Sequence, residues 1–352
     1  MLIPISAPEV LARLAEFNTV IDARSESEYA EDRLPGAVNW PSLNDAERHF
    51  VGTEYKQVSP FVAQKRGAAL VARNIAAHIE REVLDKPKDW RPLVYCWRGG
   101  KRSGAFSHIL REIGWNAHRL NGGYKAWRRQ VLDELEILPG RFRFKVVTGA
   151  TGSAKSRILE ALAAEGAQVL HLEELAAHKG SVLGRLPGAE QPSQKKFESR
   201  LYAALSAFDP QRPVFAEAES RRIGSVSLPE AMIAPLRAAP CLRIDTTLPA
   251  RIEFLLRDYD YFLADTDWLA AQLDRLRPLQ GNETVEHWLA LVRETDFPTL
   301  VAELLEKHYD PHYQRSQTKN YADYADGQSF VATDLSLDGI RQVARAIIAS
   351  AG

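Results

Sequence analysis

The chain has 352 residues, of which 45% are hydrophobic and 26% charged, so it is long enough for two domains. Its 45 Lys and Arg against 46 Asp and Glu give a net charge of −1, which excludes a uniformly basic nucleic-acid binder. The sequence has no secretory signal pattern and no apolar stretch that would span a bilayer, and its two cysteines, Cys96 and Cys241, exclude a disulfide framework or a zinc site. We therefore expect a protein of the reducing cytoplasm without membrane attachment.

The first part of the chain predicts short strands alternating with helices. "FNTVIDAR" (17–24) and "RPLVYC" (91–96) are apolar runs that favour buried strands. A helix is expected from about Ser103, since the apolar residues that follow share one helical face. Residues 115–136 then predict a strand, a Gly-Gly turn and a closing helix.

The pair Pro139-Gly140 separates this region from a second one, so we expect domains at residues 1–137 and 141–352. The second region begins with a strand, a turn that contains glycines, a helix and another strand, an order that implies a parallel sheet. Its strands are expected at 142–147, 167–174, 212–220 and 240–247. From about Pro249 the pattern becomes helical, beginning with "ARIEFLLRDYDYFLAD" (250–265).

A loop rich in glycine and cations follows the strand at 91–96. It comprises Cys96, Trp97, Arg98, Gly99, Gly100, Lys101, Arg102 and Ser103. Between a strand and a helix, such a loop directs backbone amides at one point and binds anions. The amides and the three cations favour the thiolate, so we expect Cys96 to be an ionised nucleophile rather than a core cysteine. Cys241 has no local cations and is expected in the core.

The turn "GATGSAKS" is close to the phosphate-binding pattern G-x-x-x-x-G-K-[ST]. Its candidate diphosphate-binding residues are Gly149, Thr151, Gly152, Ser153, Ala154, Lys155 and Ser156. Amides, a lysine and a hydroxyl are the groups that hold phosphates and Mg²⁺, although Ala154 replaces the second glycine. Glu217 and Glu219 follow a strand, as a metal-organising acid does in P-loop proteins, so Mg²⁺ is a candidate ion here. The alternatives are an ordinary strand–helix turn and a solvated strand end.

Three segments of the first domain resemble a rhodanese domain over about residues 5–136. They are "VIDARSESEYAEDRLPGAVNWP", "YCWRGGKRSG" and "LNGGYKAWRR". This resemblance implies a loop cysteine that carries a transferable chalcogen. From Cys96 to Arg102 the loop is C-x5-R, one residue longer than in the commonest small rhodaneses, and it also resembles the cradle of cysteine-dependent phosphatases. Those phosphatases place histidine where this chain has Tyr95, so sulfur-type transfer and phosphate-ester hydrolysis both stay open.

The two halves together resemble the bacterial tRNA 2-selenouridine synthase family over nearly the whole chain. The matching blocks are "CWRGGKRSG", "GATGSAKS", "LEELAAHKGS", "QPSQKKFES", "ESRRIG" and "HYDPHY". The resemblance implies an α/β protein in which a rhodanese-like parallel-sheet domain precedes a P-loop NTPase-like α/β domain with a helix-rich C-terminal part. Ala154 is the main departure.

The resemblance also implies the chemistry. Selenium replaces sulfur at C2 of wobble 2-thiouridine in tRNA, through a geranylated intermediate and with no tightly bound cofactor. Selenophosphate and geranyl diphosphate are the substrates. Cys96 is expected to attack selenium and carry a perselenide, and the P-loop to hold geranyl diphosphate, or alternatively ATP, beside an apolar groove among the later helices. The implied partners are the tRNA anticodon loop and a selenophosphate-producing enzyme.

With no overall positive charge, RNA contact depends on local patches. The candidate tRNA-binding residues are Lys125, Arg128, Arg129, Lys195, Lys196, Arg221 and Arg222. Weaker candidates are His178, Lys179, Arg315 and Lys319. Each of these segments is equally compatible with a solvated helix face, loop or tail. A cysteine-dependent phosphatase and an ATP-linked rhodanese-type sulfurtransferase or redox-sensing regulatory module are the alternative functions.

Overall fold

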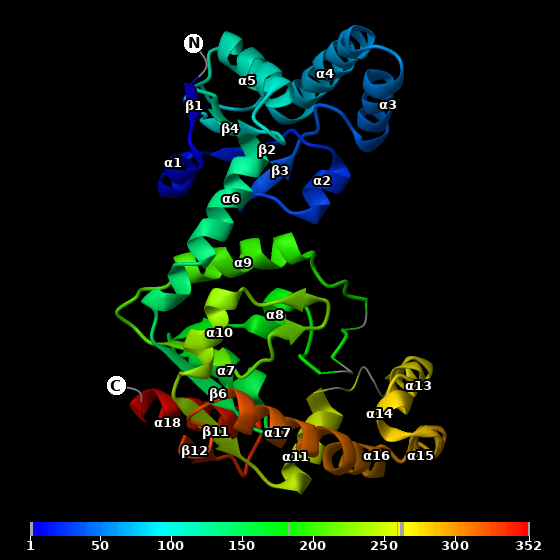
Figure 1. Cartoon of the computed structure of the whole chain (residues 1–352). Helices are drawn as coiled ribbons and strands as arrows, with labels where there is room; N and C mark the ends of the chain where they lie inside the picture. The colour runs from blue at the N-terminus through cyan, green and yellow to red at the C-terminus, as the bar shows by residue number, and fades with distance from the viewer. Residues whose placement is uncertain (1–2, 182–183, 187, 259, 261–263, 351–352) are drawn as a thin grey trace. The chain divides into compact units, whose positions relative to one another are not determined.

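The computed structural model describes residues 3–181, 184–186, 188–258, 260 and 264–350. The chain forms two compact units (Figure 1): residues 1–134 with 192–203, and residues 135–191 with 204–352. The segment 192–203 therefore belongs to the first unit, although it lies inside the second domain that the sequence predicts. This assignment depends on contacts between residues far apart in the chain, such as the 2.9 Å hydrogen bond that Ser199 Oγ donates to Asp32.

The first unit is built on a parallel sheet with the strand order β1-β5-β4-β2-β3. Its strands are β1 (Ile3–Ile5), β2 (Thr19–Asp22), β3 (Ala37–Asn39), β4 (Pro92–Tyr95) and β5 (His118–Leu120). Its helices are α1 (Ala7–Ala12), α2 (Glu26–Glu31), α3 (Asp45–Gln57), α4 (Pro60–Glu82), α5 (Lys101–Ile113) and α6 (Gly123–Leu135). The strands predicted at 17–24 and 91–96 are confirmed.

Burial in the first unit fixes the position of the cysteine loop. All four residues of β4 are buried, as expected for a central parallel strand. Phe106 and Leu110 on α5 are fully buried and join a core that includes Trp40 and Val94. Strand β4 and helix α5 are thus held against each other, and the loop between them has fixed ends. The helix begins at Lys101, two residues before the position that apolar spacing predicts.

The second unit has its own parallel sheet, with the order β12-β11-β6-β8-β7. Its strands are β6 (Phe144–Thr148), β7 (Gln168–Leu170), β8 (Val214–Glu217), β11 (Cys241–Asp245) and β12 (Gln328–Val331), with a separate antiparallel pair β9 (Arg222–Ile223) and β10 (Val226–Ser227). Its helices are α7 (Lys155–Ala164), α8 (Leu172–Ala176), α10 (Glu230–Arg237), α11 (Leu248–Asp258), α13 (Thr266–Asp274), α14 (Arg277–Gln280), α15 (Asn282–Arg293), α16 (Phe297–Leu304), α17 (Asp310–Asn320) and α18 (Leu337–Ser350). Helix α9 (Gln194–Ser206) begins in the segment of the first unit and ends in the second.

Strand β7 of the second unit ends earlier than the sequence predicts. The strand expected at 167–174 ends at Leu170, and helix α8 begins at Leu172. The buried carboxylate of Glu217 accepts a 2.8 Å hydrogen bond from the backbone amide of Leu172, which satisfies a donor at the start of this helix. The change from strand to helix gives Glu173 a position that a strand would not give it.

Helices α13 to α16 lie together (Figure 1). Their side chains form a small core, in which Trp288 is fully buried. A π-helical turn at Leu305–Tyr309 joins α16 to α17, and such turns often occur at functional sites. Helix α11 covers the first part of the helix expected at 250–265, and positions 259 and 261–263 lie outside the described residues. Over the described ranges, the helices are all too short or too polar to cross a membrane.

Candidate functional site

The cysteine loop lies between the end of β4 and the start of α5. Cys96 is 3% exposed, and its Sγ lies 3.1 Å from Oγ of Ser103, which is fully buried on the first turn of the helix. Gly100 is the N-cap residue of this helix, directly before its first residue, Lys101. The first amides of α5 therefore have no partner within the helix, and this end of its dipole favours an anion.

The start of α6 holds the loop from the other side. The amide of Tyr124 donates to the carbonyl of Cys96 at 2.8 Å, and that of Lys125 donates to the carbonyl of Trp97 at 3.0 Å. At Gly123 the backbone φ is +60°, and a Cβ there would lie 2.2 Å from the Cys96 oxygen. The Gly-Gly turn that the sequence predicts thus has a specific purpose, because only glycine permits this close approach to the cysteine.

The three loop cations differ in their environment. Arg98 and Lys101 are exposed, whereas Arg102 is mostly buried and donates to Oε2 of Glu28 at 2.9 Å. The Nε of Arg48 lies 3.1 Å from the same oxygen. Burial acts to raise the pKa of Glu28, but the bonds and charges of Arg102 and Arg48 outweigh it and lower this pKa. A cavity of about 450 Å³ is lined by Arg102, Arg48 and Trp97 together with Ser27, Glu28 and Glu31.

The glycine-bearing turn lies between β6 and α7, in the context that a phosphate-binding loop requires. A Cβ at Gly152 (φ +83°) would lie 2.9 Å from the side chain of Leu255, so helix α11 approaches the backbone of the turn closely. Ala154, 4% exposed, has the left-handed conformation (φ 58°, ψ 25°). The alanine therefore adopts a backbone conformation that glycine adopts at lower cost.

Lys155 extends over its own loop. Its Nζ donates to the carbonyls of Gly149 at 2.5 Å and Ala150 at 3.2 Å, and it lies 5.2 Å from the centre of the Tyr313 ring. Burial lowers the pKa of Lys155, and the charges of Glu173 and Glu219 partly offset that effect. A bound anion would stabilise the charged form of such a buried lysine.

Three carboxyl groups lie beside the lysine. Glu217 and Glu219, the two that the sequence predicts, have raised pKa values, because both are buried and both are near Glu173; the pKa of Glu217 rises to about 8. Glu173 itself accepts a 2.8 Å hydrogen bond from Oγ of Ser156. Sequence reasoning missed Glu173, because "HLEE" was assigned to a strand. The hydroxyl and carboxylate oxygens of Ser156 and Glu173 are the donor types that Mg²⁺ prefers.

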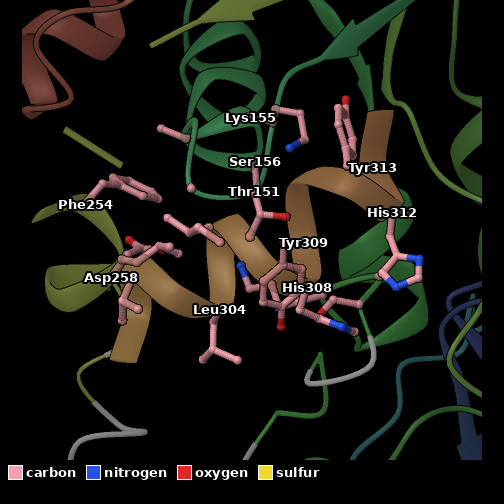
Figure 2. Close-up of a pocket in the computed structure, with 18 of the residues that line it drawn as sticks. Thr151, Lys155, Ser156, Phe254, Asp258, Leu304, His308, Tyr309, His312 and Tyr313 are labelled. Carbon is pink, nitrogen blue, oxygen red and sulfur yellow. The ribbon is translucent and has the colours of Figure 1, made fainter. Parts of the chain in front are cut away.

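A cavity of about 470 Å³ opens from the turn (Figure 2), with Thr151, Lys155 and Ser156 on one side and Leu304 opposite. The rest of its wall is largely apolar. The apolar residues are Phe254, Leu255, Leu256, Leu269, Leu279, Phe297, Leu300, Val301, Leu304 and Leu305. His308, Tyr309, His312 and Tyr313 add an aromatic side. The cavity is therefore polar where phosphates would bind and apolar beyond that point.

Helix α17 is held beside the same turn by hydrogen bonds. Arg251 is 6% exposed, donates through Nε to the carbonyl of Thr151 at 2.7 Å, and makes two bonds to Asp310 at 2.6 and 2.9 Å. Tyr313 Oη accepts from the amide of Gly149 at 2.7 Å. The "HYDPHY" segment thus lies beside the glycine-bearing turn, a position that the sequence match did not specify.

The candidate tRNA-binding cations are partly engaged within the protein. Arg128 is paired with Glu198, and Lys195 with Glu31. Arg221 pairs with Glu230, and Arg222 donates to the carbonyl of Gly224 at 2.8 Å. Lys125 and Arg129 are exposed, and Lys196 is half-buried near Arg33 and Arg200.

The weaker candidates for tRNA binding also include both buried or cavity-lining residues and exposed ones. His178 is buried and accepts from the amide of Gly180 at 3.1 Å, and Lys179 lines the apolar-walled cavity. Arg315 and Lys319 are exposed on α17.

Cys241 is 1% exposed, and burial raises the pKa of its thiol to about 11, so its expected place in the core is confirmed.

Comparisons with known proteins agree on both units. A model of the "tRNA 2-selenouridine synthase AAA domain" matches residues 142–272, and a rhodanese-like domain model matches residues 6–130. A tRNA 2-selenouridine synthase from Alcanivorax borkumensis is 33% identical over 326 residues, covering 84% of this chain and 88% of that protein. One from Nitrosomonas europaea is 36% identical over 244 residues, covering 68% of this chain and 63% of that protein.

Among solved structures, a rhodanese-related protein from Thermoplasma volcanium aligns with 17% identity and a TM-score of 0.25, covering 36% of this chain and 92% of that one. The matching blocks, the two parallel sheets and the full-length relatives lead to one conclusion. The chain belongs to the tRNA 2-selenouridine synthase family.

Proposed function

We propose that this protein replaces sulfur by selenium at C2 of wobble 2-thiouridine in tRNA, through an S-geranyl intermediate, with geranyl diphosphate and selenophosphate as substrates. The observation that carries this proposal is the cavity of the second unit, which joins a phosphate-binding turn to an apolar wall. Its relatives are named for the selenouridine product, and its first unit supplies the nucleophile, Cys96.

The cavity favours geranyl diphosphate over ATP. An isoprenoid diphosphate has one anionic end and one hydrocarbon end, in the same order as Lys155 and Leu304 across the cavity. Adenine and ribose would place hydrogen-bonding groups against leucine and phenylalanine side chains, at the cost of their desolvation. Burial holds Glu217 and Glu219 towards their neutral forms, which reduces their repulsion of a diphosphate.

The first step is alkyl transfer. The sulfur of 2-thiouridine attacks C1 of the geranyl chain, so that a C–S bond forms, the C–O bond to diphosphate breaks, and N3 of the base gives up its proton. Lys155 and the amides at the start of α7 stabilise the departing diphosphate. Ser156 and Glu173 would hold Mg²⁺, which adds positive charge to the phosphates.

The second step exchanges the alkylated sulfur for selenium at the cysteine loop. The anticodon loop presents the geranylated base, and selenophosphate binds at the start of α5. Overall, a C–Se bond forms at C2 and the C–S bond breaks, so that geranylthiol leaves. The P–Se bond of selenophosphate also breaks, and water takes up the phosphoryl group as phosphate. A selenophosphate-producing enzyme supplies the donor. Cys96 must remain a thiol for this purpose, which places the reaction in a reducing compartment such as the cytoplasm.

The test is a two-stage reconstitution with purified protein and a 2-thiouridine anticodon stem-loop. Geranyl diphosphate is added first and selenophosphate second, and nucleosides are identified after each stage. We expect S-geranyl-2-thiouridine and then 2-selenouridine. An unmodified nucleoside together with hydrolysis of ATP, or with turnover of a simple phosphate ester, would instead support one of the two alternative functions.

A further inference from the structure

Electron balance limits what Cys96 can take from selenophosphate. If the thiolate attacked selenium, an S–Se bond would form and phosphorus would leave with the electron pair of the P–Se bond, as phosphite. Phosphate would result only with an oxidant, which the proposed reaction does not supply. If the thiolate attacks phosphorus, an S–P bond forms, the P–Se bond breaks and selenium leaves as hydroselenide, with no change of oxidation state.

The loop has the groups that phosphoryl transfer to cysteine needs. Its C-x5-R interval places Arg102 next to the first amides of α5, which together suit three phosphoryl oxygens. Ser103 Oγ lies 3.1 Å from Sγ and 3.4 Å from the carbonyl of Gly100. A hydroxyl at this distance donates to the sulfur when it leaves again as a thiolate, and so assists hydrolysis of a phosphocysteine.

The cavity beside the loop offers guanidinium groups to a phosphoryl group. Two guanidinium groups, of Arg102 and Arg48, share the carboxylate of Glu28, and the other carboxylate of the lining, that of Glu31, is paired with Lys195. Glu28 Oε2 is itself fixed by Ser25, through its amide at 3.2 Å and its hydroxyl at 3.3 Å. The carboxylate therefore positions Arg102 without removing the attraction for a phosphoryl group.

We propose that Cys96 accepts the phosphoryl group of selenophosphate, not its selenium, which makes the protein a selenophosphate phosphohydrolase as well. The proposal rests on the proposed function. Hydroselenide then attacks C2 of the S-geranyl nucleoside; a C–Se bond forms, the C–S bond breaks, and geranylthiol leaves with the proton of the hydroselenide. Water hydrolyses the S–P bond, which releases phosphate and restores the Cys96 thiolate. The perselenide expected from the sequence is not formed.

The experiment uses selenophosphate radiolabelled at phosphorus, added to the whole protein and quenched rapidly. A phosphoryl group and a selenium atom add nearly the same mass, so the label on phosphorus decides between them. We expect label on Cys96 in the wild type and none in Cys96→Ala. Ser103→Ala should accumulate more label, because loss of a hydrogen bond to a developing charge slows hydrolysis roughly tenfold to a hundredfold.

Two variants separate the chemistry of Ser103 from packing. Ser103→Thr keeps the hydroxyl and should restore hydrolysis. Ser107→Ala removes a buried hydroxyl one turn further along α5, which donates to the carbonyl of Ser103 at 2.8 Å, and should leave the label at the wild-type level. Equal accumulation in Ser103→Ala and Ser107→Ala would overturn the role of Ser103.

The same preparations are assayed for selenation of a geranylated stem-loop. Selenium on the protein without labelled phosphorus, or phosphite in solution by phosphorus NMR, would overturn the phosphocysteine while selenation continued. If the wild-type protein did not selenate the stem-loop at all, the proposed function itself would be contradicted. Failure of the phosphocysteine proposal and failure of the proposed function therefore give different results.

Discussion

The molecule contains two turns of the same kind with opposite surroundings. Residues 96–103 and 149–156 each follow a buried parallel strand and lead into a helix, so each presents backbone amides to an anion. The first turn contains a thiol and is surrounded by guanidinium groups. The second contains one lysine, lies beside three carboxyl groups and opens into an apolar-walled cavity.

Under the proposed function, one backbone arrangement would serve two reactions. In the proposed reaction, the guanidinium groups and the thiol of the first turn suit attack on a bound phosphoryl group. At the second, no cysteine is present within residues 149–156, and the apolar wall suits a ligand whose reacting carbon lies beyond the phosphates. In the proposed function both turns bind an anion, and the neighbouring side chains determine which bond is broken.

The largest expected effect comes from removal of the nucleophile. Cys96→Ala should abolish selenium incorporation and spare geranylation, because no other residue of the first turn can make the S–P bond. The measurement is nucleoside analysis of tRNA from cells that carry only the variant. Selenouridine in those cells would show that the first turn does not need a thiol, and loss of the geranylated nucleoside would show that the two turns share one reaction.

At the second turn the corresponding change is Lys155→Ala. It should weaken geranyl diphosphate binding roughly tenfold to a hundredfold, since a charge-assisted hydrogen bond to the diphosphate is lost. Calorimetric titration with geranyl diphosphate and with ATP checks this, and selenation of a stem-loop that is already geranylated is the control. Loss of ATP binding with unchanged geranyl diphosphate binding would show that the turn binds ATP instead of geranyl diphosphate.

Both turns could be predicted from the sequence because each is local: strand, loop and helix follow one another within about 20 residues. The side chains that surround the two turns could not be predicted in this way. Glu28, which positions Arg102, lies 74 residues away from it, and the Arg128–Glu198 pair joins residues 70 apart. The mixture of cations and an aromatic residue in "KAWRR" made Arg128 an RNA-binding candidate, but its burial and its partner depend on such distant contacts.

The second turn was predicted less completely than the first. An apolar groove among the later helices was expected, but which residues form its wall depends on how α11 and α13 to α16 pack. Glu173 was missed because an apolar run before charged residues is compatible with either a strand or the start of a helix. The π-helical turn has no signal in the sequence pattern.

The apolar wall distinguishes the two turns, so filling it should affect one substrate only. Leu304→Trp should weaken geranyl diphosphate binding about tenfold and leave binding of inorganic diphosphate unchanged, because the larger side chain occupies hydrocarbon space. Competition between the two ligands measures this. Leu291→Trp overpacks the same small core without lining the cavity, so it controls for loss of stability. Equal losses in both variants would assign the effect to folding.

The stability of the protein should depend on pH through Glu217, which lies beside the second turn. Glu217 has a pKa of about 8 in the folded protein, above its ordinary 4.5, so the folded state binds more protons than the unfolded state between these values. The free energy of unfolding should therefore fall as pH rises from about 4.5 to 8, by at most about 1.4 kcal/mol per pH unit. Glu217→Gln, which stays neutral, should reduce this slope in scanning calorimetry of the whole chain. An unchanged slope would mean that Glu217 is ionised in the folded protein.

The smallest expected effect concerns Ala154, which stands where a glycine is usual at the second turn. Replacing it by glycine relieves a left-handed alanine, worth about 1 to 2 kcal/mol, but loses a buried methyl of about 0.8 kcal/mol and adds unfolded-state entropy of about 0.4 to 1 kcal/mol. These contributions nearly cancel, so Ala154→Gly should change the free energy of unfolding by less than about 1 kcal/mol. Ala177 is also left-handed (φ 49°) but is not buried, so Ala177→Gly should be the more stabilising change. Calorimetry of both variants tests this difference; a larger gain at Ala154 would mean that its methyl is strained against the core rather than packed in it.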